Sequence, residues 1–384
     1  MAYYRDAEPT AASTQERIGV LLVNLGTPDA PTYFAVQRYL REFLGDRRVI
    51  DAPRLIWLPL LYGVILPLRP LRTVRKYRKI WTPEGSPLAV YSASLAAKVG
   101  ARLRADLEDR VRVELAMTYG QPSIADAVRR LAGQNVKRML VLPLYPQYCS
   151  ATTGSVFDRT ASVLGRMRWL PETRFVNDYH RDPGYIAALA ECVRAHRRQQ
   201  RRPSHLVFSY HGIPARYAAA GDPYPAQAEA TTRLVAARLG LAAGDWSHCY
   251  QSRFGRAEWL QPYTEDTLKE LVARGVRRVS VLSPSFAVDC LETLEEVGME
   301  YRDRFVELGG ESLTLVAGLN DDDRHVELLA RIAKNHLQGW VDGESLDEIR
   351  RDASLDNDRS AGSGASAGND RSAGNGDTDS PDRA

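Results

Sequence analysis

The feature that most constrains this chain is a regular alternation of short, β-branched apolar runs with longer stretches of helical periodicity. Such alternation is typical of parallel sheets with helices packed on them, and so predicts an α/β fold. The runs predict four strands in the first half and four in the second, at residues 18–25, 111–117, 138–144, 173–177, 204–210, 246–250, 277–282 and 313–316. Four strands in each half indicate two similar domains, each with a four-stranded parallel sheet.

A repeated segment supports duplication. Residues 136–143 (VKRMLVLP) resemble residues 276–283 (VRRVSVLS), 140 positions later. The helical and strand pattern is interrupted at 181–184 (RDPG), so we expect one domain at 17–180 and a second at 181–324. A terminal helix at 325–341 is expected to pack back on the first domain, and an acidic Ser/Gly/Asp tail at 342–384 is predicted to be disordered.

The charge is unevenly distributed. Residues 342–384 hold eleven acids and five arginines, a net charge of −6, and because the whole chain carries +3, residues 1–341 carry +9. An anionic ligand or membrane surface is therefore a reasonable partner. Nucleic acid is disfavoured, because the charge is not spread over several basic patches. The 44% hydrophobic and 26% charged content excludes collagen-like, disulfide-scaffold and wholly disordered classes.

The cysteines and the amino terminus predict a cytoplasmic protein. The four cysteines are scattered without a C-x-x-C pair, which predicts neither a disulfide framework nor a zinc knuckle. Residues 1–19 have no apolar core typical of a signal peptide. The longest uncharged run, 55–68, is shorter than the roughly 20 residues of a spanning helix and contains Pro59, Gly63 and Pro67, so we expect it not to cross a membrane. Peripheral contact with a membrane surface stays open.

Candidate functional residues follow the predicted strands. Ligands of open parallel sheets bind beyond the carboxyl ends of the strands. Polar and aromatic segments stand there at 24–28 (NLGTP), 118–120 (TYG), 143–148 (PLYPQY), 209–214 (SYHGIP), 251–255 (QSRFG) and 283–286 (SPSF). Neither G-x-G-x-x-G opening a helix nor a phosphate-binding loop is present, which argues against dinucleotide or nucleoside triphosphate chemistry.

His211 is the sharpest single candidate. An imidazole at the end of a strand can take up a proton or, when neutral, bind a metal. Gly212 and Pro214 beside it would let the backbone approach a ligand. The alternative is a buried structural histidine, and the sequence leaves both open.

A row of acids forms the second candidate. Asp289, Glu292, Glu296 and Glu300 fall on one stripe of a predicted helix at about 100° per residue. Like charges four residues apart repel, so the row has some energetic cost without a cation, and a metal or proton role is one of two interpretations that the spacing leaves open. The alternative is a solvated face that begins with a capping box at Asp289 and Glu292.

The third candidate is a basic helix at 69–79. Arg72, Arg75, Lys76 and Lys79 share one face, and no acid interrupts them. Together with the apolar run upstream, this segment suits a flat apolar ligand with peripheral carboxylates, or an anionic membrane. The alternative is a packed helix with a solvated basic face.

Taken together, the motifs resemble those of ferrochelatase, the enzyme that inserts ferrous iron into protoporphyrin IX in haem synthesis. The resemblance spans roughly 17–340 and is closest to the bacterial protoporphyrin type. It rests on 23–28 (VNLGTP), 85–87 (GSP), 142–147 (LPLYPQ), 209–214 (SYHGIP), 221–225 (GDPYP), 251–255 (QSRFG) with 259–260 (WL), and 289–296 (DCLETLEE).

The resemblance implies two Rossmann-like domains with the porphyrin in the cleft between them. It also implies that the porphyrin ring is distorted out of its plane when bound. It implies that His211 and Glu292 face each other as the pair that binds iron and removes protons, and that Asp289 and Glu296 extend a proton or metal path. The porphyrin-binding residues that it implies are Leu25, Arg72, Arg75, Tyr119, Ser252, Trp259 and Phe286, with Arg72 or Arg75 pairing with propionates. The run 55–68 resembles a lip over the cleft.

Two departures from the family matter. Some relatives bind a [2Fe–2S] cluster through one cysteine in the loop before Thr-Thr-Gly-Ser and three near the carboxyl terminus. Here Ser150 occupies that position, Cys149 precedes it, and no cysteine follows Cys290, so we predict no cluster and no permanently bound cofactor. The alternatives are a chelatase for another tetrapyrrole such as coproporphyrin, and a non-catalytic tetrapyrrole- or solute-binding protein.

Overall fold

The computed structural model describes residues 16–200, 202–255 and 257–341. The described residues up to Gln338 belong to one compact unit, which holds every strand described, and a second unit begins at Gly339. The predicted disordered tail at 342–384 lies outside the described residues. The domain limits drawn at 180 and 324 stay a prediction.

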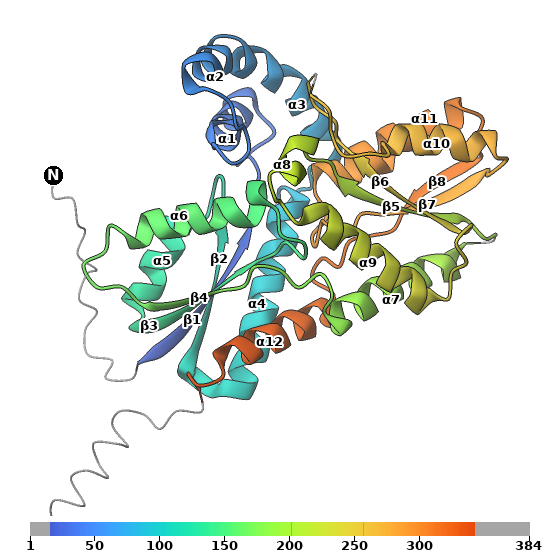
Figure 1. Cartoon of the computed structure of the whole chain (residues 1–384). Helices are drawn as coiled ribbons and strands as arrows, with labels where there is room; N and C mark the ends of the chain where they lie inside the picture. The colour runs from blue at the N-terminus through green and yellow to red at the C-terminus, as the bar shows by residue number, and fades with distance from the viewer. Residues whose placement is uncertain (1–15, 201, 256, 342–384) are drawn as a thin grey trace, which may run out of the picture. The chain divides into compact units, whose positions relative to one another are not determined.

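Eight strands among the described residues form two parallel sheets of four (Figure 1). The strands are β1 (Arg17–Asn24), β2 (Val111–Met117), β3 (Val136–Pro143), β4 (Glu172–Phe175), β5 (His205–His211), β6 (Trp246–Gln251), β7 (Arg278–Leu282) and β8 (Ser312–Leu315). Their orders, β2-β1-β3-β4 and β6-β5-β7-β8, are equivalent. The repeated sequence segment supplies the third strand of each sheet, β3 and β7. The α/β class and the two four-stranded sheets are confirmed, each strand within two residues of its predicted limits.

The first sheet is covered on both faces, which explains why its central strand is a nearly continuous apolar run. In β1, residues 18–24 are buried, and Leu22 lies opposite Leu115 and Leu142 in the two neighbouring strands. Helices α5 (Ile124–Gly133) and α6 (Ser155–Leu164) pack on one face in a common apolar cluster. Helix α4 (Pro87–Leu107) contacts β2.

The second sheet is built in the same way. Apolar residues of α10 (Thr264–Ala273), of the π-helix η4 (Glu292–Tyr301) and of α11 (Arg302–Glu307) form one cluster with β5, β7 and β8. The remaining helices of this half are α7 (Pro183–Gln199), α8 (Ala215–Ala219) and α9 (Tyr224–Leu239). Asp182 caps α7 by accepting hydrogen bonds from the backbone of Gly184 and Tyr185.

Helix α12 (Asp323–Leu337) runs along α4, as Figure 1 shows. Arg102 Nε lies 2.6 Å from Glu327 Oε1, and Lys334 pairs with Asp106. Through Arg102 and Asp106 on α4, these two ion pairs attach the last described helix to the first half of the chain.

Between β1 and β2 in the sequence, the chain forms a group of helices that we call the helical arm, and it contains the predicted lip. It comprises α1 (Tyr33–Gly45), α2 (Arg54–Leu60), the π-helix η1 (Leu61–Ile65) and α3 (Leu66–Ile80). The other short helices of the unit are η2 (Glu108–Arg110) and η3 (Ser150–Gly154).

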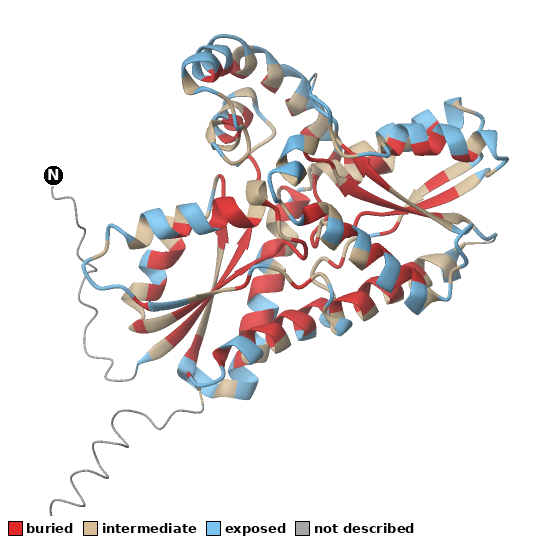
Figure 2. Cartoon of the chain, viewed as in Figure 1, coloured by how far each residue is buried: buried red, intermediate tan, exposed pale blue. Residues whose placement is uncertain are grey.

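The expectation that the run 55–68, which contains Pro59, Gly63 and Pro67, is too short to match a spanning helix was wrong. Residues 54–80 form one continuous helical stretch, because the backbone widens into a π-helical turn at 61–65, directly after Pro59, and Pro67 lies in the first turn of α3. By length and composition alone, Arg54–Ile80 is a candidate membrane span, so the length argument against crossing no longer holds. Its outer face is exposed, with Leu55 91% and Ile56 69% accessible (Figure 2).

Candidate active site

The carboxyl ends of the central strands hold the predicted site residues of the second half. His211 ends β5 and Gln251 ends β6, and the two lie opposite each other in the parallel register. The segment after β7 carries Phe286, whose ring centroid lies 6.3 Å from that of His211. The Trp259 ring centroid lies 6.4 Å from that of the imidazole. The structure therefore brings His211, Trp259 and Phe286 together.

His211 is half-buried, and one of its ring nitrogens is already engaged. Nδ1 lies 2.6 Å from the carbonyl oxygen of Gly212, which can only accept, so Nδ1 donates and carries the proton of the neutral ring. That tautomer leaves the lone pair on Nε2 available for a metal or a proton. A Cβ at position 212 would meet Gln251 O at 3.0 Å and the Trp259 ring at 3.1 Å, so glycine is needed for close packing beside the histidine.

Glu292 begins the π-helix η4 and faces residues of the helical arm. Its charge contributes to raising the pKa of Tyr77, for which burial is the larger cause. Burial lowers the pKa of Arg69, and the negative charge of Glu292 opposes that change. A carboxylate from the second half thus lies within electrostatic reach of side chains from α3.

Glu296 is an electrostatic neighbour of both His211 and Glu292. Its Oε2 accepts a 2.6 Å hydrogen bond from Ser252 Oγ, and its Oε1 accepts one of 2.9 Å from Tyr301 OH. Burial raises the pKa of this carboxyl and Glu292 adds to the effect, while Ser252, His211 and Tyr301 oppose it. A carboxyl whose pKa is raised in this way can take up a proton nearer to neutral pH.

Asp289 stands apart from the helix and does not form the capping box that the sequence allowed. Helix η4 begins after Leu291 without a side-chain cap. The buried Asp289 carboxylate instead accepts hydrogen bonds from Thr293 Oγ1 at 2.9 Å, Asn320 Nδ2 at 2.8 Å and the Gly318 backbone at 3.1 Å. Burial raises the pKa of Asp289, and these donors oppose it.

The predicted four-acid stripe is also altered at its far end. Glu300 pairs with Lys76 at 2.7 Å, on α3. Residues 292–301 follow the wider π-helical path, whose hydrogen bonds span five residues, so the α-helical spacing used for the prediction does not apply. Of the four acids, Glu292 and Glu296 are the two that act on each other.

The sequence analysis missed Glu295. Its side chain is only 2% exposed and lies 2.9 Å from Lys76 Nζ and 2.8 Å from Lys79 Nζ. Burial works to raise the pKa of Glu295, but the two ammonium groups outweigh it and hold the pKa below its ordinary value. We call this three-residue cluster the lysine clasp; it joins α3 to η4. The available signal was the uninterrupted cationic run on one segment and the acidic run on the other.

The remaining predicted porphyrin-binding residues fall into different settings. Leu25 is half-buried and packs between two apolar clusters, one on the first sheet and one in the helical arm. Arg72 and Arg75 are exposed on α3. Trp259 Nε1 is buried and has no hydrogen-bond partner among the described residues.

Tyr119 is fully buried in this structure, and its expected contact with a porphyrin stays a prediction. Its hydroxyl donates to Asp46 Oδ2 at 3.0 Å, and the guanidinium of Arg159 lies 4.5 Å from its ring centroid. Tyr119 therefore belongs to the core between the first sheet and the helical arm. Arg69, which the sequence did not single out, is half-buried with its guanidinium 4.6 Å from the Phe254 ring.

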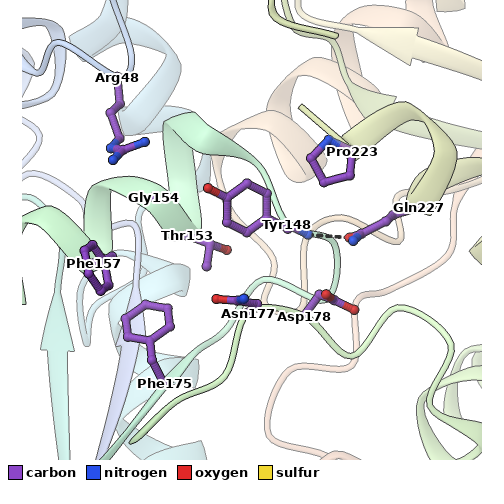
Figure 3. A pocket seen from close by; sticks show the side chains of 10 residues that line it. All are labelled: Arg48, Tyr148, Thr153, Gly154, Phe157, Phe175, Asn177, Asp178, Pro223 and Gln227. Atoms are coloured by element: carbon purple, nitrogen blue, oxygen red, sulfur yellow. Dashed lines mark hydrogen bonds between the residues drawn. The ribbon is translucent and has the colours of Figure 1, made fainter. Parts of the chain in front are cut away.

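A separate cavity of about 340 Å³ opens at the end of the first sheet (Figure 3). Its lining residues are Arg48, Tyr148, Thr153, Gly154, Phe157, Phe175, Asn177, Asp178, Pro223 and Gln227. No predicted site residue lines it, and Arg48 is already bound to Asp158 and Ser150. Within the described ranges, no group of three or more His, Cys, Asp or Glu side chains is arranged to hold a metal.

Comparisons with known proteins agree with the motifs. The family profile described as Ferrochelatase matches residues 17–337. A ferrochelatase of Teredinibacter turnerae is 49% identical over 328 residues, which cover 85% of this chain and 90% of the relative. A ferrochelatase of Thioalkalivibrio sulfidiphilus is 48% identical over 358 residues, covering 93% and 95%.

A solved structure shares the fold. SirB from Bacillus subtilis with Fe³⁺ superposes with a TM-score of 0.50 at 11% identity, covering 83% of this chain and 94% of that protein. At this identity the match concerns the chain path alone.

Proposed function

The chain belongs to the ferrochelatase family, lyases that insert a metal ion into a porphyrin in haem biosynthesis, and from that membership we propose that its own substrates are Fe²⁺ and protoporphyrin IX. The reaction exchanges the two pyrrole N–H protons of the porphyrin for Fe²⁺ and gives protohaem and two protons. It needs a group that holds iron weakly beside the ring and groups that accept protons there.

The observation that carries the proposal is the electrostatic grouping of His211, Glu292 and Glu296. His211 Nε2 has its lone pair available because Nδ1 donates to Gly212 O. Glu296 is within electrostatic reach of both other residues. We assign iron binding and proton removal to His211 and Glu292, and assign onward proton transfer to Glu296. For Asp289, whose carboxylate is held by three donors, we propose the outer end of the same path.

The porphyrin-facing roles are proposed on position. Trp259 and Phe286 flank the imidazole, so we propose that they pack against the ring system. Ser252 would act at the same edge through its bond to Glu296. Arg72 and Arg75 are free to reach propionates from α3, and Leu25 is proposed to line the first-half wall.

Protoporphyrin is favoured over coproporphyrin by the helical arm. Protoporphyrin carries two vinyl groups where coproporphyrin has two further propionates, so it is the more apolar of the two. The exposed apolar side chains of α2 and η1 would receive an apolar porphyrin at low desolvation cost. Coproporphyrin remains the second candidate, because the basic residues of α3 would also suit a more acidic ring.

The same arm supports a proposal about location. We propose a cytoplasmic enzyme that touches an anionic membrane surface through the exposed face of α2, with the arginines of α3 near the headgroups. The absence of a [2Fe–2S] cluster, predicted from the cysteine positions, stays a prediction.

Anaerobic insertion assays with Fe²⁺ and each porphyrin test the proposal. We expect turnover of protoporphyrin IX to exceed that of coproporphyrin III at equal concentration. The assay is repeated with His211→Ala, which should lose turnover. His205→Gln is its matched control, since His205 lies at the opposite end of β5 and bonds to Ser247. It should keep wild-type turnover. Preference for coproporphyrin would move the enzyme to the second candidate, and no insertion into either porphyrin would refute the assignment.

A further inference from the structure

Gln251 connects the strand end that carries His211 to the helix that carries Glu292. Its backbone carbonyl accepts a 2.8 Å hydrogen bond from the N–H of Gly212, directly after His211. Its side chain is buried, at 2% exposure, and points to η4, where Nε2 donates to the carbonyl oxygen of Glu292 at 3.1 Å. One residue thus contacts the backbone beside both members of the proposed catalytic pair.

The orientation of the Gln251 amide is fixed from the other side. Its Oε1 accepts a 2.7 Å hydrogen bond from Ser209 Oγ on β5 and a longer one, 3.4 Å, from Ser283 Oγ after β7. Because the Glu292 carbonyl can only accept, the NH₂ group must face it, and both hydroxyls then donate to Oε1. Ser209 in turn bonds to Thr264 at 2.8 Å. Ser209 on β5 and Ser283 after β7 therefore hold the amide in one orientation.

Helix η4 is held locally by Thr293, whose Oγ1 donates to Asp289 Oδ1 at 2.9 Å and accepts from the Cys290 N–H at 3.0 Å. No side chain caps its first turn, and π-helical hydrogen bonding is uncommon in proteins. The bond to the Glu292 carbonyl fixes the first residue of the helix to the sheet. The next residue along the chain, Ser252, holds the carboxylate of Glu296 at 2.6 Å. The dipeptide 251–252 thus fixes one turn of η4 at two points.

We infer that Gln251 is a positioning residue that sets where the Glu292 carboxylate stands relative to the imidazole of His211, an inference that rests on the proposed function. A misplacement of about 1 Å between reacting groups can cost about 100-fold in rate. Gln251 touches neither substrate in this account. Its effect on catalysis comes from holding the Glu292 backbone.

The test compares Gln251→Met with wild type. Methionine has similar length and volume but donates no hydrogen bond to Glu292 O, so the helix start is released while the core stays filled. The control is Thr264→Val, which disturbs the same buried network at Ser209 without touching the Gln251 amide. Gln251→Asn, which keeps an amide but is too short to reach Glu292, provides a second variant if the methionine protein folds poorly.

Three readouts separate positioning from simple loss of folded protein. Porphyrin binding is measured by fluorescence. Turnover with Fe²⁺ is measured anaerobically and divided by the amount of enzyme that binds porphyrin. The metal site is followed by the absorption spectrum of added Co²⁺. For Gln251→Met we expect kcat to fall about 10- to 100-fold, porphyrin affinity to stay within about twofold, and the Co²⁺ spectrum to change. Thr264→Val should lower the melting temperature and leave kcat and the Co²⁺ spectrum unchanged.

Two results would overturn the inference. Wild-type kcat and Co²⁺ spectrum in Gln251→Met and Gln251→Asn would show that the Glu292 bond does not position the site. A fall in kcat as large in Thr264→Val would show that the network acts through stability instead. Failure of the proposed function is a separate outcome: wild type would then insert iron into neither porphyrin, and a wrong catalytic pair would instead appear as wild-type insertion by His211→Ala and Glu292→Gln.

Discussion

The two sheets have the same strand order, but the carboxyl ends of their central strands differ. In the first sheet, Asn24 ends β1 and is buried, and its Nδ2 donates to Ser92 Oγ at 3.0 Å. In the second, His211 ends the equivalent strand β5, is half-buried and keeps Nε2 available. One strand end is closed by internal hydrogen bonds, and the other keeps a group for a ligand.

The neighbouring strand ends repeat the contrast. Tyr119 after β2 is enclosed, with its hydroxyl bound to Asp46. Ser252 after β6 reaches Glu296 on η4, and its φ of 66° places it in the left-handed region that is rare outside glycine. Strain of this kind persists where the surroundings fix it, and it often marks functional sites. The proposed function therefore places the reactive groups at the second sheet and gives the first sheet the part of a wall.

The largest expected effect comes from replacing each of the two equivalent strand-end residues, His211 and Asn24, by alanine. His211→Ala should lower insertion by about 100- to 10,000-fold, the range usual for a lost acid–base group, while porphyrin still binds. Asn24→Ala should destabilise the fold by about 1 to 3 kcal/mol, because it leaves buried groups unpaired, and keep kcat per folded molecule. Equal loss of kcat in both variants would break the comparison.

The lysine clasp should show the next largest effect, on stability. Glu295→Gln removes a buried charge from Lys76 and Lys79, both of which are partly exposed and can rehydrate, so we expect a loss of about 1.5 to 3 kcal/mol. Urea unfolding measures it. Glu300→Gln, which breaks an exposed pair with the same Lys76, should lose less than about 1 kcal/mol. Similar losses would mean that the clasp is an ordinary surface contact.

A smaller effect is expected on the helical arm, which has no counterpart in the second half. Leu55→Ser should weaken binding to anionic vesicles by about tenfold and leave the free energy of unfolding within about 0.5 kcal/mol, because this side chain is 91% exposed. Vesicle co-sedimentation measures the binding. Leu234→Ser, at a 40% exposed position on α9, should leave vesicle binding unchanged, and loss in both would point to a general surface effect.

The smallest effect is a pH dependence within η4. Burial raises the pKa of Glu296 above its ordinary 4.5, so above that pH the native state holds a proton that the unfolded chain has released. Its contribution to stability therefore falls as pH rises through that window, by about 1.4 kcal/mol for each unit of difference. Glu296→Gln should gain stability relative to wild type as pH increases from about 4.5.

The contribution of Glu295 to stability changes with pH in the opposite direction to that of Glu296, although both residues lie on η4. The pKa of Glu295 lies below the ordinary 4.5, so its contribution is present above that pH and is lost as the pH falls through the lowered value. Unfolding curves of Glu295→Gln and Glu296→Gln across pH should therefore diverge from wild type in opposite directions. Parallel curves would contradict the assigned environments.

Local pattern was sufficient for the sheets and insufficient for the helix that carries the acids. Strands such as β1 are specified by apolar runs that both faces bury, and this signal is contained in a few adjacent residues. The π-helical turns at 61–65 and 292–301 depend on what packs against them. The bond between Lys79 and Glu295 joins residues 216 positions apart, which no local period can predict.

The same distinction between local and long-range signals applies to the candidate site. His211 was identifiable because a strand, a glycine and a proline surround it in sequence. The burial of Tyr119 could not be predicted from its own sequence segment, because the helical arm packs over it. Gln251 was visible only as part of a motif, since its role depends on a bond to η4.

A single-turnover experiment tests the central claim most directly. Enzyme loaded with protoporphyrin IX is mixed anaerobically with Fe²⁺ in a stopped-flow instrument, and porphyrin absorbance is followed for wild type and Glu292→Gln. The account predicts that the variant binds porphyrin with wild-type stoichiometry and inserts iron at least about 100-fold more slowly. Insertion by Glu292→Gln at the wild-type rate would contradict it, because Glu292 would then take no part in the chemistry.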